Sequence, residues 1–225
     1  MRFGFYVSNH ASRLTKAIAF LQSLSALSKM LSNIAFVMRD SVLDDRLNAE
    51  CRNANITLHQ LSLDEIERSM KSILVSDALL NLMKDNNADY LFVFGSRLLK
   101  GPLLKHYENK IINFHPSLLP AFPGVKSIDQ AIQYGSSIIG NTAHFIDEGI
   151  DTGQIIMQNI AVVKHPVDYD VILDNQIPML IQLMQWLSDN RISVSGRRVL
   201  VERASYGFAP FVPNLELQEL QSFHG

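Results

Sequence analysis

Residues 111–124, IINFHPSLLPAFPG, hold an apolar run followed by three prolines. The apolar run predicts a strand, and the prolines predict a stiff loop directly after it. Asn113 and His115 stand two residues apart, so both side chains point to the same side of an extended chain. This arrangement suits a site that handles a carbonyl, because an amide can stabilise an oxyanion while an imidazole moves or stabilises a proton.

Apolar runs alternate with helical patterns along the rest of the chain. The runs predict strands over 3–7, 33–38, 56–60, 90–94, 140–146 and 154–163. The helical patterns cover 14–24, 42–53, 62–85, 104–107, 128–134 and 169–187, and the helix over 62–85 is expected to open with a capping box at Ser62. Such alternation predicts an α/β fold with a largely parallel sheet and helices on both faces.

The bulk composition is that of an ordinary globular protein. The chain has 225 residues, of which 47% are hydrophobic and 19% charged, with a formal net charge of -2. We expect one catalytic domain over 1–190 and a small C-terminal tail over 191–225, which packs on that domain or on a partner subunit. The charge leaves no basic footprint for nucleic acid, so the expected partners are small molecules.

Cysteine usage and hydropathy indicate a cytoplasmic protein. Cys51 is the only cysteine, which excludes an intramolecular disulfide and a multi-cysteine metal site. The first residues are apolar for too short a run to be a signal peptide, and no stretch is long enough to span a membrane. The acidic loop over 147–153 contains two glycines, but its spacing differs from that of an EF-hand, so we predict no metal site.

The turn after the first strand is a candidate anion site. It reads Ser8-Asn9-His10-Ala11-Ser12-Arg13 and stands between a strand and a helix, where backbone N–H groups and the helix dipole hold anions. Arg13 adds a positive charge. Ser12 could instead serve only as the N-cap that any first βα unit needs, and both interpretations stay open at this point.

The motifs together resemble the formyltransferase family that uses 10-formyltetrahydrofolate. The resemblance rests on the segment over 113–120, on Pro123-Gly124, on Gly140, Thr142, His144 and Phe145, and on Asp151 with Gly153 after it. It extends over about residues 1–188, is strongest over 111–158, and is closest to the branch that formylates glycinamide ribonucleotide in purine synthesis. It implies a Rossmann-like fold and 10-formyltetrahydrofolate as the donor co-substrate.

The resemblance also implies the site residues. The catalytic triad maps onto Asn113, His115 and Asp151, with His144 supporting Asp151. Asn113 and His115 would serve the oxyanion, and Asp151 would orient a water or take a proton. The folate-binding positions map onto Arg97, Leu98 and Leu99 and onto the acidic loop with Asp147 and Glu148; the acceptor-binding positions map onto Ser12, Arg13 and Gln176.

The acceptor half departs from the family pattern. Relatives that act on glycinamide ribonucleotide show a glycine-rich turn after the first strand, whereas this chain has side chains in place of both glycines. Such side chains hinder close backbone approach to a phosphate, although Arg13 could hold one directly. Gln176 stands near the position expected for the family's acceptor-binding glutamate. The acceptor is therefore glycinamide ribonucleotide or, as an alternative, a nucleotide-linked amino sugar of a surface polysaccharide.

Three further alternatives come from the same residues. Methionyl-tRNA formylation is disfavoured because the chain has no basic C-terminal domain to grip RNA. Hydrolysis of the formyl donor is also open, although the deformylases of this family carry an N-terminal regulatory domain that we do not find. A non-catalytic folate-binding protein is disfavoured because it would have no chemical need for the triad. Aromatic residues in the tail, Tyr206, Phe208 and Phe211 among them, could support a homodimer.

Overall fold

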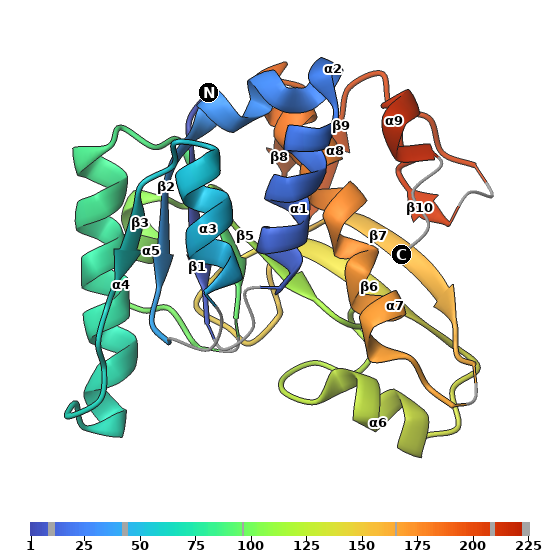
Figure 1. The fold of residues 1–225 in the computed structure, drawn as a ribbon. Coiled ribbons are helices and arrows are strands. Elements are labelled where there is room, and N and C mark those ends of the chain that lie inside the picture. The colour runs from blue at the N-terminus through green and yellow to red at the C-terminus, as the bar shows by residue number, and fades with distance from the viewer. Residues whose placement is uncertain (9–11, 42–44, 96, 165, 208–209, 222–225) are drawn as a thin grey trace. The chain divides into compact units, whose positions relative to one another are not determined.

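The computed structural model describes residues 1–8, 12–41, 45–95, 97–164, 166–207 and 210–221 (Figure 1). The chain divides into two compact units, Met1–Ile112 and Asn113–Gly225.

The first unit is built on four parallel strands. They are β1 (Phe3–Val7), β2 (Ile34–Arg39), β3 (Leu58–Gln60) and β4 (Tyr90–Phe94), in the order β4-β1-β2-β3. β1 pairs in parallel with both β2 and β4, and all five of its residues are buried. A strand that is covered on both faces needs apolar residues at every position, which explains the continuous runs in β1 and β4.

The helices of the first unit pack in pairs. They are α1 (Ser12–Ser23), α2 (Ser25–Ser28), the 3-10 helix η1 (Lys29–Asn33), α3 (Arg46–Asn53), α4 (Arg68–Asp85) and α5 (Pro102–His106). α1 packs against α3, and Figure 1 shows the two helices side by side. α4 packs against α5 and β1. A Cβ atom on Gly4 of β1 would lie 2.6 Å from the Phe36 ring and 3.0 Å from the Met83 sulfur of α4, so only glycine permits this approach.

The second unit has mostly antiparallel pairing. Its strands are β5 (Ile111–His115, which continues across the boundary), β6 (Ile138–Phe145), β7 (Ile155–Val162) and β10 (Phe211–Val212), in the order β10-β7-β6-β5. β6 pairs antiparallel with β7, and β7 antiparallel with β10. A separate hairpin is formed by β8 (Ile192–Ser195) and β9 (Arg198–Val201).

The helices of the second unit are α6 (Ser127–Gln133), α7 (Tyr169–Asp174), α8 (Gln176–Ser188) and α9 (Gln218–Gln221). Every residue of α8 from Gln176 to Met184 is buried, and Trp186 is fully buried as a core aromatic. The tail is tied to this helix: Gln182 Oε1 accepts from Glu216 N at 2.7 Å, and Glu216 Oε1 accepts from Arg191 Nη2 at 2.8 Å.

The predicted α/β class is confirmed, and two helix predictions are corrected. α4 begins at Arg68 because Ser62 Oγ donates to Asp64 Oδ2 instead of capping a helix. The helix predicted over 169–187 is divided at Asn175 into α7 and α8. Pro178 has no N–H to donate to the carbonyl of Asp174, so a continuous helix cannot keep its full hydrogen-bond ladder there. The predicted helix over 42–53 begins at Arg46 in α3, and its residues 42–44 lie outside the described part.

Candidate functional site

The candidate site lies in the second unit and starts from the end of β5. Asn113 and His115 share one side of this strand, as their spacing predicts, and His115 is its last residue. His115 is 4% exposed. Its Nε2 lies 2.9 Å from the carbonyl oxygen of Phe122. Because a carbonyl only accepts, the proton of the neutral imidazole is on Nε2, and Nδ1 carries the lone pair.

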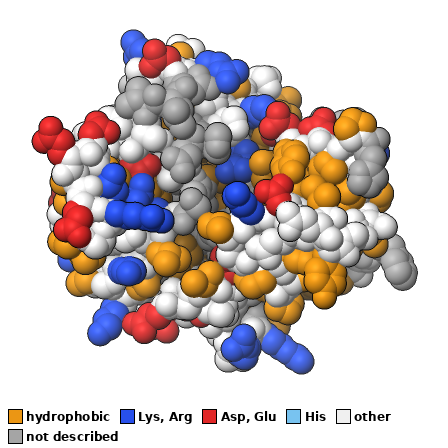
Figure 2. Space-filling view, turned by 90° about the horizontal axis from the view of Figure 1, so that it is seen from below, with side chains coloured by type: hydrophobic (Ala, Val, Ile, Leu, Met, Phe, Trp, Pro, Cys, Tyr) orange, Lys and Arg blue, Asp and Glu red, His pale blue; other side chains and the backbone are white. Residues whose placement is uncertain are grey.

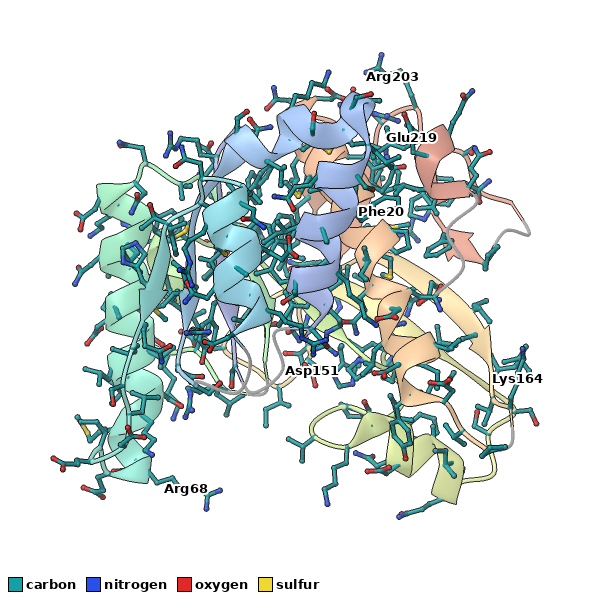
Figure 3. All side chains as sticks on the ribbon, in the orientation of Figure 1. Phe20, Arg68, Asp151, Lys164, Arg203 and Glu219 are labelled. Atoms are coloured by element: carbon teal, nitrogen blue, oxygen red, sulfur yellow. The ribbon has the colours of Figure 1, made fainter. Side chains whose placement is uncertain are left out.

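His115 Nδ1 faces Asp151, in the loop between β6 and β7 (Figure 3). A carboxylate only accepts, so this contact becomes a hydrogen bond when Nδ1 gains a proton. His115 Nδ1 lies 3.3 Å from Asp151 Oδ2, and the same oxygen accepts from the backbone N–H of Gly124 at 2.7 Å. Asp151 has a φ of 53°, in the left-handed region that aspartate tolerates better than most residues. The predicted triad residues Asn113, His115 and Asp151 are therefore brought into one cluster.

His144 completes this cluster. Its Nδ1 lies 2.8 Å from the carbonyl oxygen of Phe145, which places the proton on Nδ1. Its Nε2 then accepts from Asn113 Nδ2 at 3.2 Å and lies 3.5 Å from Asp151 Oδ1. An asparagine amide has two N–H donors, so the bond to His144 orients the amide and leaves the second donor for a substrate oxygen.

Local backbone geometry sets the directions of the His144 side chain and of the Phe122 carbonyl. The pairing of β6 with β7 shifts register between Ala143 and His144, and such bulges often redirect a side chain next to an active site. Phe122 has a φ of 53°, which is unusual for a bulky residue. Its strained conformation presents the carbonyl to His115, and strain of this kind clusters at functional sites.

The electrostatics of the cluster depend on burial and on these contacts. Burial lowers the pKa of His115 below its ordinary value of 6.5, while the Phe122 carbonyl and the charge of Asp151 partly oppose this shift. Burial would raise the pKa of Asp151, but His144, the Gly124 N–H and His115 together lower it below 3.8. Near neutral pH the pair is therefore a neutral imidazole beside a carboxylate, ready to receive a proton.

Gly153 gives a structural test of the His144 contact. A Cβ atom there would lie 1.8 Å from the Phe145 carbonyl oxygen, the same oxygen that accepts from His144. We expect Gly153→Ala to lower the free energy of unfolding by about 3 kcal/mol, because the strands must shift to relieve the clash. Urea denaturation measures this. Gly196→Ala, where the added atom meets open space but φ is +60°, should cost only about 1 kcal/mol. Equal losses in the two variants would contradict a steric cause.

The chain is similar in sequence to known proteins. The model of the family described as "Formyl transferase" matches residues 1–176. The chain belongs to the formyl transferase family. Its match to the phosphoribosylglycinamide formyltransferase of Bacillus subtilis is 55% identical over 62 residues, which are 28% of this chain and 32% of that protein. The formyltetrahydrofolate deformylase of Haemophilus influenzae is 34% identical over 130 residues, or 57% of this chain and 45% of that one. The chain thus spans less than half the length of these curated relatives.

Solved structures agree with the family assignment. Glycinamide ribonucleotide transformylase 1 from Symbiobacterium toebii is 25% identical with a TM-score of 0.72, covering 89% of this chain and 93% of that one. A formyltetrahydrofolate deformylase from Pseudomonas syringae is 22% identical with a TM-score of 0.71, covering 89% of this chain and 65% of that one. This second likeness concerns the fold.

The remaining predicted site residues lie in both units. In the first, Arg97 to Leu99 follow β4, with Leu98 47% exposed and Leu99 6% exposed. α1 begins at Ser12, and Arg13 is its second residue. The predicted anion site over Ser8–Arg13 includes residues 9–11, which lie outside the described part. The roles of these residues stay predictions.

Three predicted site residues lie in the second unit outside the triad. Asp147 Oδ1 accepts from Gly149 N at 3.0 Å and from Thr152 Oγ1 at 2.7 Å, so this carboxylate holds the acidic loop together. Glu148 is exposed. Gln176 is fully buried and its Nε2 donates to Asn141 Oδ1 at 2.7 Å, so its observed contact is internal to the unit. Their binding roles stay predictions.

The sequence did not predict the hydrogen bonds that brace the proline-containing loop. Thr142 Oγ1 donates to the Ser117 carbonyl at 2.7 Å and accepts from Leu119 N at 3.0 Å. Gln158 Nε2 donates to the Leu119 carbonyl at 3.0 Å and to Thr142 Oγ1 at 2.9 Å. The alternation of β6 and β7 places Thr142 opposite Gln158. Thr142 is among the motif residues of the family resemblance, but its contacts with the loop were not predicted.

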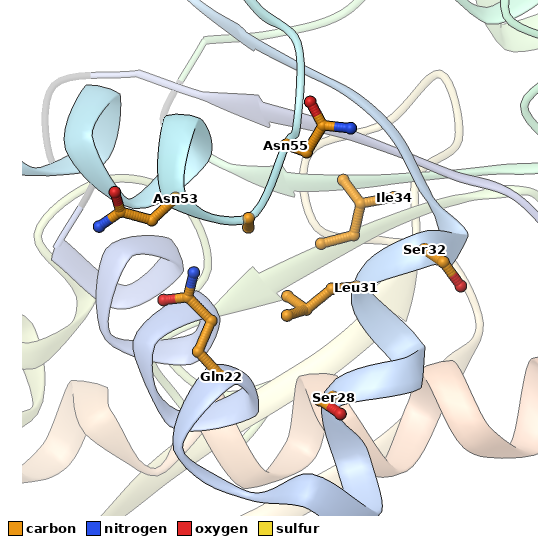
Figure 4. Close-up of a pocket in the computed structure, with 8 residues that line it drawn as sticks. Gln22, Ser28, Leu31, Ser32, Ile34, Asn53 and Asn55 are labelled. Carbon is orange, nitrogen blue, oxygen red and sulfur yellow. The ribbon is translucent and has the colours of Figure 1, made fainter.

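A second feature of the chain is a pocket of about 580 Å³ in the first unit (Figure 4). Its lining includes Gln22, Ile34 and Asn55 and contains no acidic or basic side chain. Ile34 begins β2 and Asn55 precedes β3, so the pocket lies at the amino ends of these strands. Ligands of open α/β sheets bind at the carboxyl ends, so we assign no reaction to this pocket.

Neither a membrane span nor a metal cluster is found in the described ranges. Among those residues, no helix combines the length and the apolar character needed to cross a bilayer. The same residues contain no group of three or more histidine, cysteine, aspartate or glutamate side chains arranged to hold a metal ion. Figure 2 shows acidic side chains among the basic ones on one face of the molecule.

Proposed function

We propose that the protein is an N-formyltransferase, which moves the formyl group of 10-formyltetrahydrofolate to a primary amine of a small phosphorylated acceptor. The leading acceptor is glycinamide ribonucleotide. The observation that carries the proposal is the His115–Asp151 pair: Nδ1 lies 3.3 Å from the carboxylate, while Nε2 is engaged by the Phe122 carbonyl. Family membership and the likeness to phosphoribosylglycinamide formyltransferase support the same reaction.

The chemistry divides among the residues of the cluster. The amine nitrogen attacks the formyl carbon, a carbon–nitrogen bond forms, and the carbonyl oxygen becomes an oxyanion. Asn113 donates its second amide N–H to that oxyanion. The attacking nitrogen, now positively charged, gives a proton to His115 Nδ1, and Asp151 stabilises the imidazolium. The bond from carbon to the folate nitrogen then breaks, and this nitrogen receives the proton. No net proton is gained or lost.

One further observation supports the proposal that the cluster binds a substrate. Asn113 Oδ1 is buried and has no hydrogen-bond partner among the described residues. An unpaired buried acceptor costs free energy unless a ligand satisfies it. An N–H group of the acceptor amine would do so. For the folate, we propose the segment with Arg97, Leu98 and Leu99 and the acidic loop with Asp147 and Glu148 as the binding residues.

The pH dependence follows from His115. It accepts a proton only when neutral, and burial lowers its pKa below 6.5. We therefore expect formyl transfer to be constant near neutral pH and to fall on acidification, with a midpoint below 6.5 that reports the folded-state pKa. The measurement is kcat/KM between pH 4.5 and pH 9, at about half-unit steps. A midpoint at or above 7 would contradict the assignment of His115 as the base.

Deformylation is a second candidate because of the similarity to formyltetrahydrofolate deformylase. Water would then replace the amine at the same cluster. The test incubates the full chain with 10-formyltetrahydrofolate alone, with glycinamide ribonucleotide, and with several nucleotide-linked amino sugars, and it follows tetrahydrofolate and formate. Transfer to glycinamide ribonucleotide without formate is the expected result. Formate release without an amine would establish the deformylase instead, and transfer only to an amino sugar would replace the leading acceptor.

A further inference from the structure

Three polar side chains meet inside the first unit at the carboxyl ends of three neighbouring strands. Tyr6 comes from β1, Asp40 directly follows β2, and Arg97 follows β4 by three residues. Tyr6 Oη donates to Asp40 Oδ2 at 2.8 Å, and Arg97 Nε donates to the same oxygen at 2.7 Å. Because β1 pairs in parallel with both β2 and β4, their carboxyl ends lie at one edge, where open α/β sheets bind ligands.

The contacts among Tyr6, Asp40 and Arg97 are not explained by a gain in fold stability. The side chain of Asp40 is 1% exposed, and its Oδ1 is buried without a hydrogen-bond partner in the described part of the chain. Tyr6 is fully buried. A buried ion pair is on average no better for stability than apolar residues of similar size, and an unpaired carboxylate oxygen adds a desolvation cost. The burial of Tyr6 and the charge of Asp40 raise the pKa of the phenol, so Tyr6 stays a donor throughout the physiological range.

Arg97, which Asp40 holds, is the first residue of a segment without regular secondary structure. The segment Arg97–Leu99 is fixed at its other end as well, since Lys100 N donates to Ser76 Oγ of α4 at 2.9 Å. Between these two anchors Leu98 is 47% exposed and Leu99 is buried. Among the described residues, no hydrogen bond engages the backbone of Leu98 or Leu99. Their N–H and C=O groups are therefore available to a ligand.

We infer that Asp40, with Tyr6 behind it, is a positioning residue that fixes Arg97 and thereby presents the Arg97–Leu99 segment to the folate. This inference rests on the proposed function, in which that segment binds 10-formyltetrahydrofolate. Ser76 holds the far end and Asp40 the near end, so the segment is clamped before the ligand arrives. A pre-positioned segment loses less conformational entropy on binding, which favours affinity.

The test compares Asp40→Asn and Tyr6→Phe with wild type. Asp40→Asn removes the charge that holds Arg97, and we expect KM for 10-formyltetrahydrofolate and Kd for tetrahydrofolate to rise about tenfold. Tyr6→Phe removes one hydrogen bond and should raise them about threefold. KM for the acceptor and kcat at saturating folate should stay within about twofold, because the triad is untouched. Asp64→Asn, an exposed carboxylate of the same unit, is the control.

A double-mutant cycle with Arg97→Lys separates positioning from a general structural effect. If Asp40 acts through Arg97, then Asp40→Asn causes little further loss of folate affinity once Arg97 is replaced. Additive losses would overturn the inference, and so would wild-type folate affinity in Asp40→Asn. Thermal unfolding monitors the fold, and Tyr6→Phe carries the test if Asp40→Asn does not fold. Calorimetry with tetrahydrofolate separates a failure of the proposed function from a failure of the positioning role. If wild type does not bind tetrahydrofolate, the proposed function is overturned. If wild type binds and both variants bind equally well, only the positioning role is overturned.

Discussion

Asp151→Asn is expected to reduce kcat for formyl transfer by about 10³-fold while the fold stays intact. The substitution removes the negative charge that lies 3.3 Å from His115 Nδ1 and that stabilises the imidazolium during proton transfer. The loop should survive, because asparagine also tolerates the left-handed backbone at φ 53°, and its side-chain oxygen can still accept from Gly124 N. Folate release in the presence of acceptor measures kcat, and urea denaturation measures stability.

The control for this prediction is Asp129→Asn in the same unit. Asp129 accepts a hydrogen bond from Tyr169 Oη and has no contact with the cluster, so the variant should keep wild-type kcat. KM for the folate should change little in Asp151→Asn, since the lost interaction acts only in the transition state. Turnover of Asp151→Asn within about tenfold of wild type would contradict the role of Asp151 in proton transfer.

Asn113→Ala is expected to reduce kcat by about 10²–10³-fold, the usual effect of removing one oxyanion donor. The amide is already oriented, because one N–H is donated to His144 Nε2 at 3.2 Å. Its second N–H is thus available to the developing charge at little entropic cost. Steady-state kinetics at saturating folate and acceptor measure the loss.

Asn113→Asp tests whether the donor, and not the size, of this side chain matters. The carboxylate has nearly the same shape, but it presents an acceptor where the amide presents N–H groups, and its charge opposes an oxyanion. We expect a loss at least as large as in Asn113→Ala. An active Asn113→Asp variant would mean that the oxyanion is stabilised elsewhere, and the backbone N–H groups of the loop over 116–124 would become the candidates.

The elements predicted best were those whose pattern is set by burial alone. β1 and β4 match their predicted bounds, because a strand covered on both faces is apolar at every position. Helix boundaries were predicted less well. Ser62 carries the pattern of an N-cap, yet its hydroxyl bonds to Asp64, and α4 starts six residues later. Such local competition between side chain and backbone is not encoded in a motif.

The side chains of the candidate cluster could be predicted from the sequence, whereas the backbone groups that contact them could not. Asn113 and His115 follow from the period of a strand, and Asp151 from the family resemblance. The Phe122 carbonyl and the Gly124 N–H are backbone groups, so no residue type marks them in a sequence. Their positions depend on left-handed conformations at Phe122 and Gly124. Gln176 stays a predicted acceptor residue, and its amide is fully buried against Asn141, because α8 is enclosed on nearly all sides.

The Phe122 carbonyl has a consequence for the speed of the proton step. When His115 gains a proton on Nδ1, Phe122 O already faces one ring nitrogen and Asp151 Oδ2 the other. Both oxygens are held in advance, the first by a fixed backbone conformation and the second by the N–H of Gly124. In water the solvent dipoles would have to turn toward the new charge. In the folded protein both oxygens are already oriented toward the imidazole. The proposed proton transfer therefore needs little further reorganisation, which lowers its activation free energy.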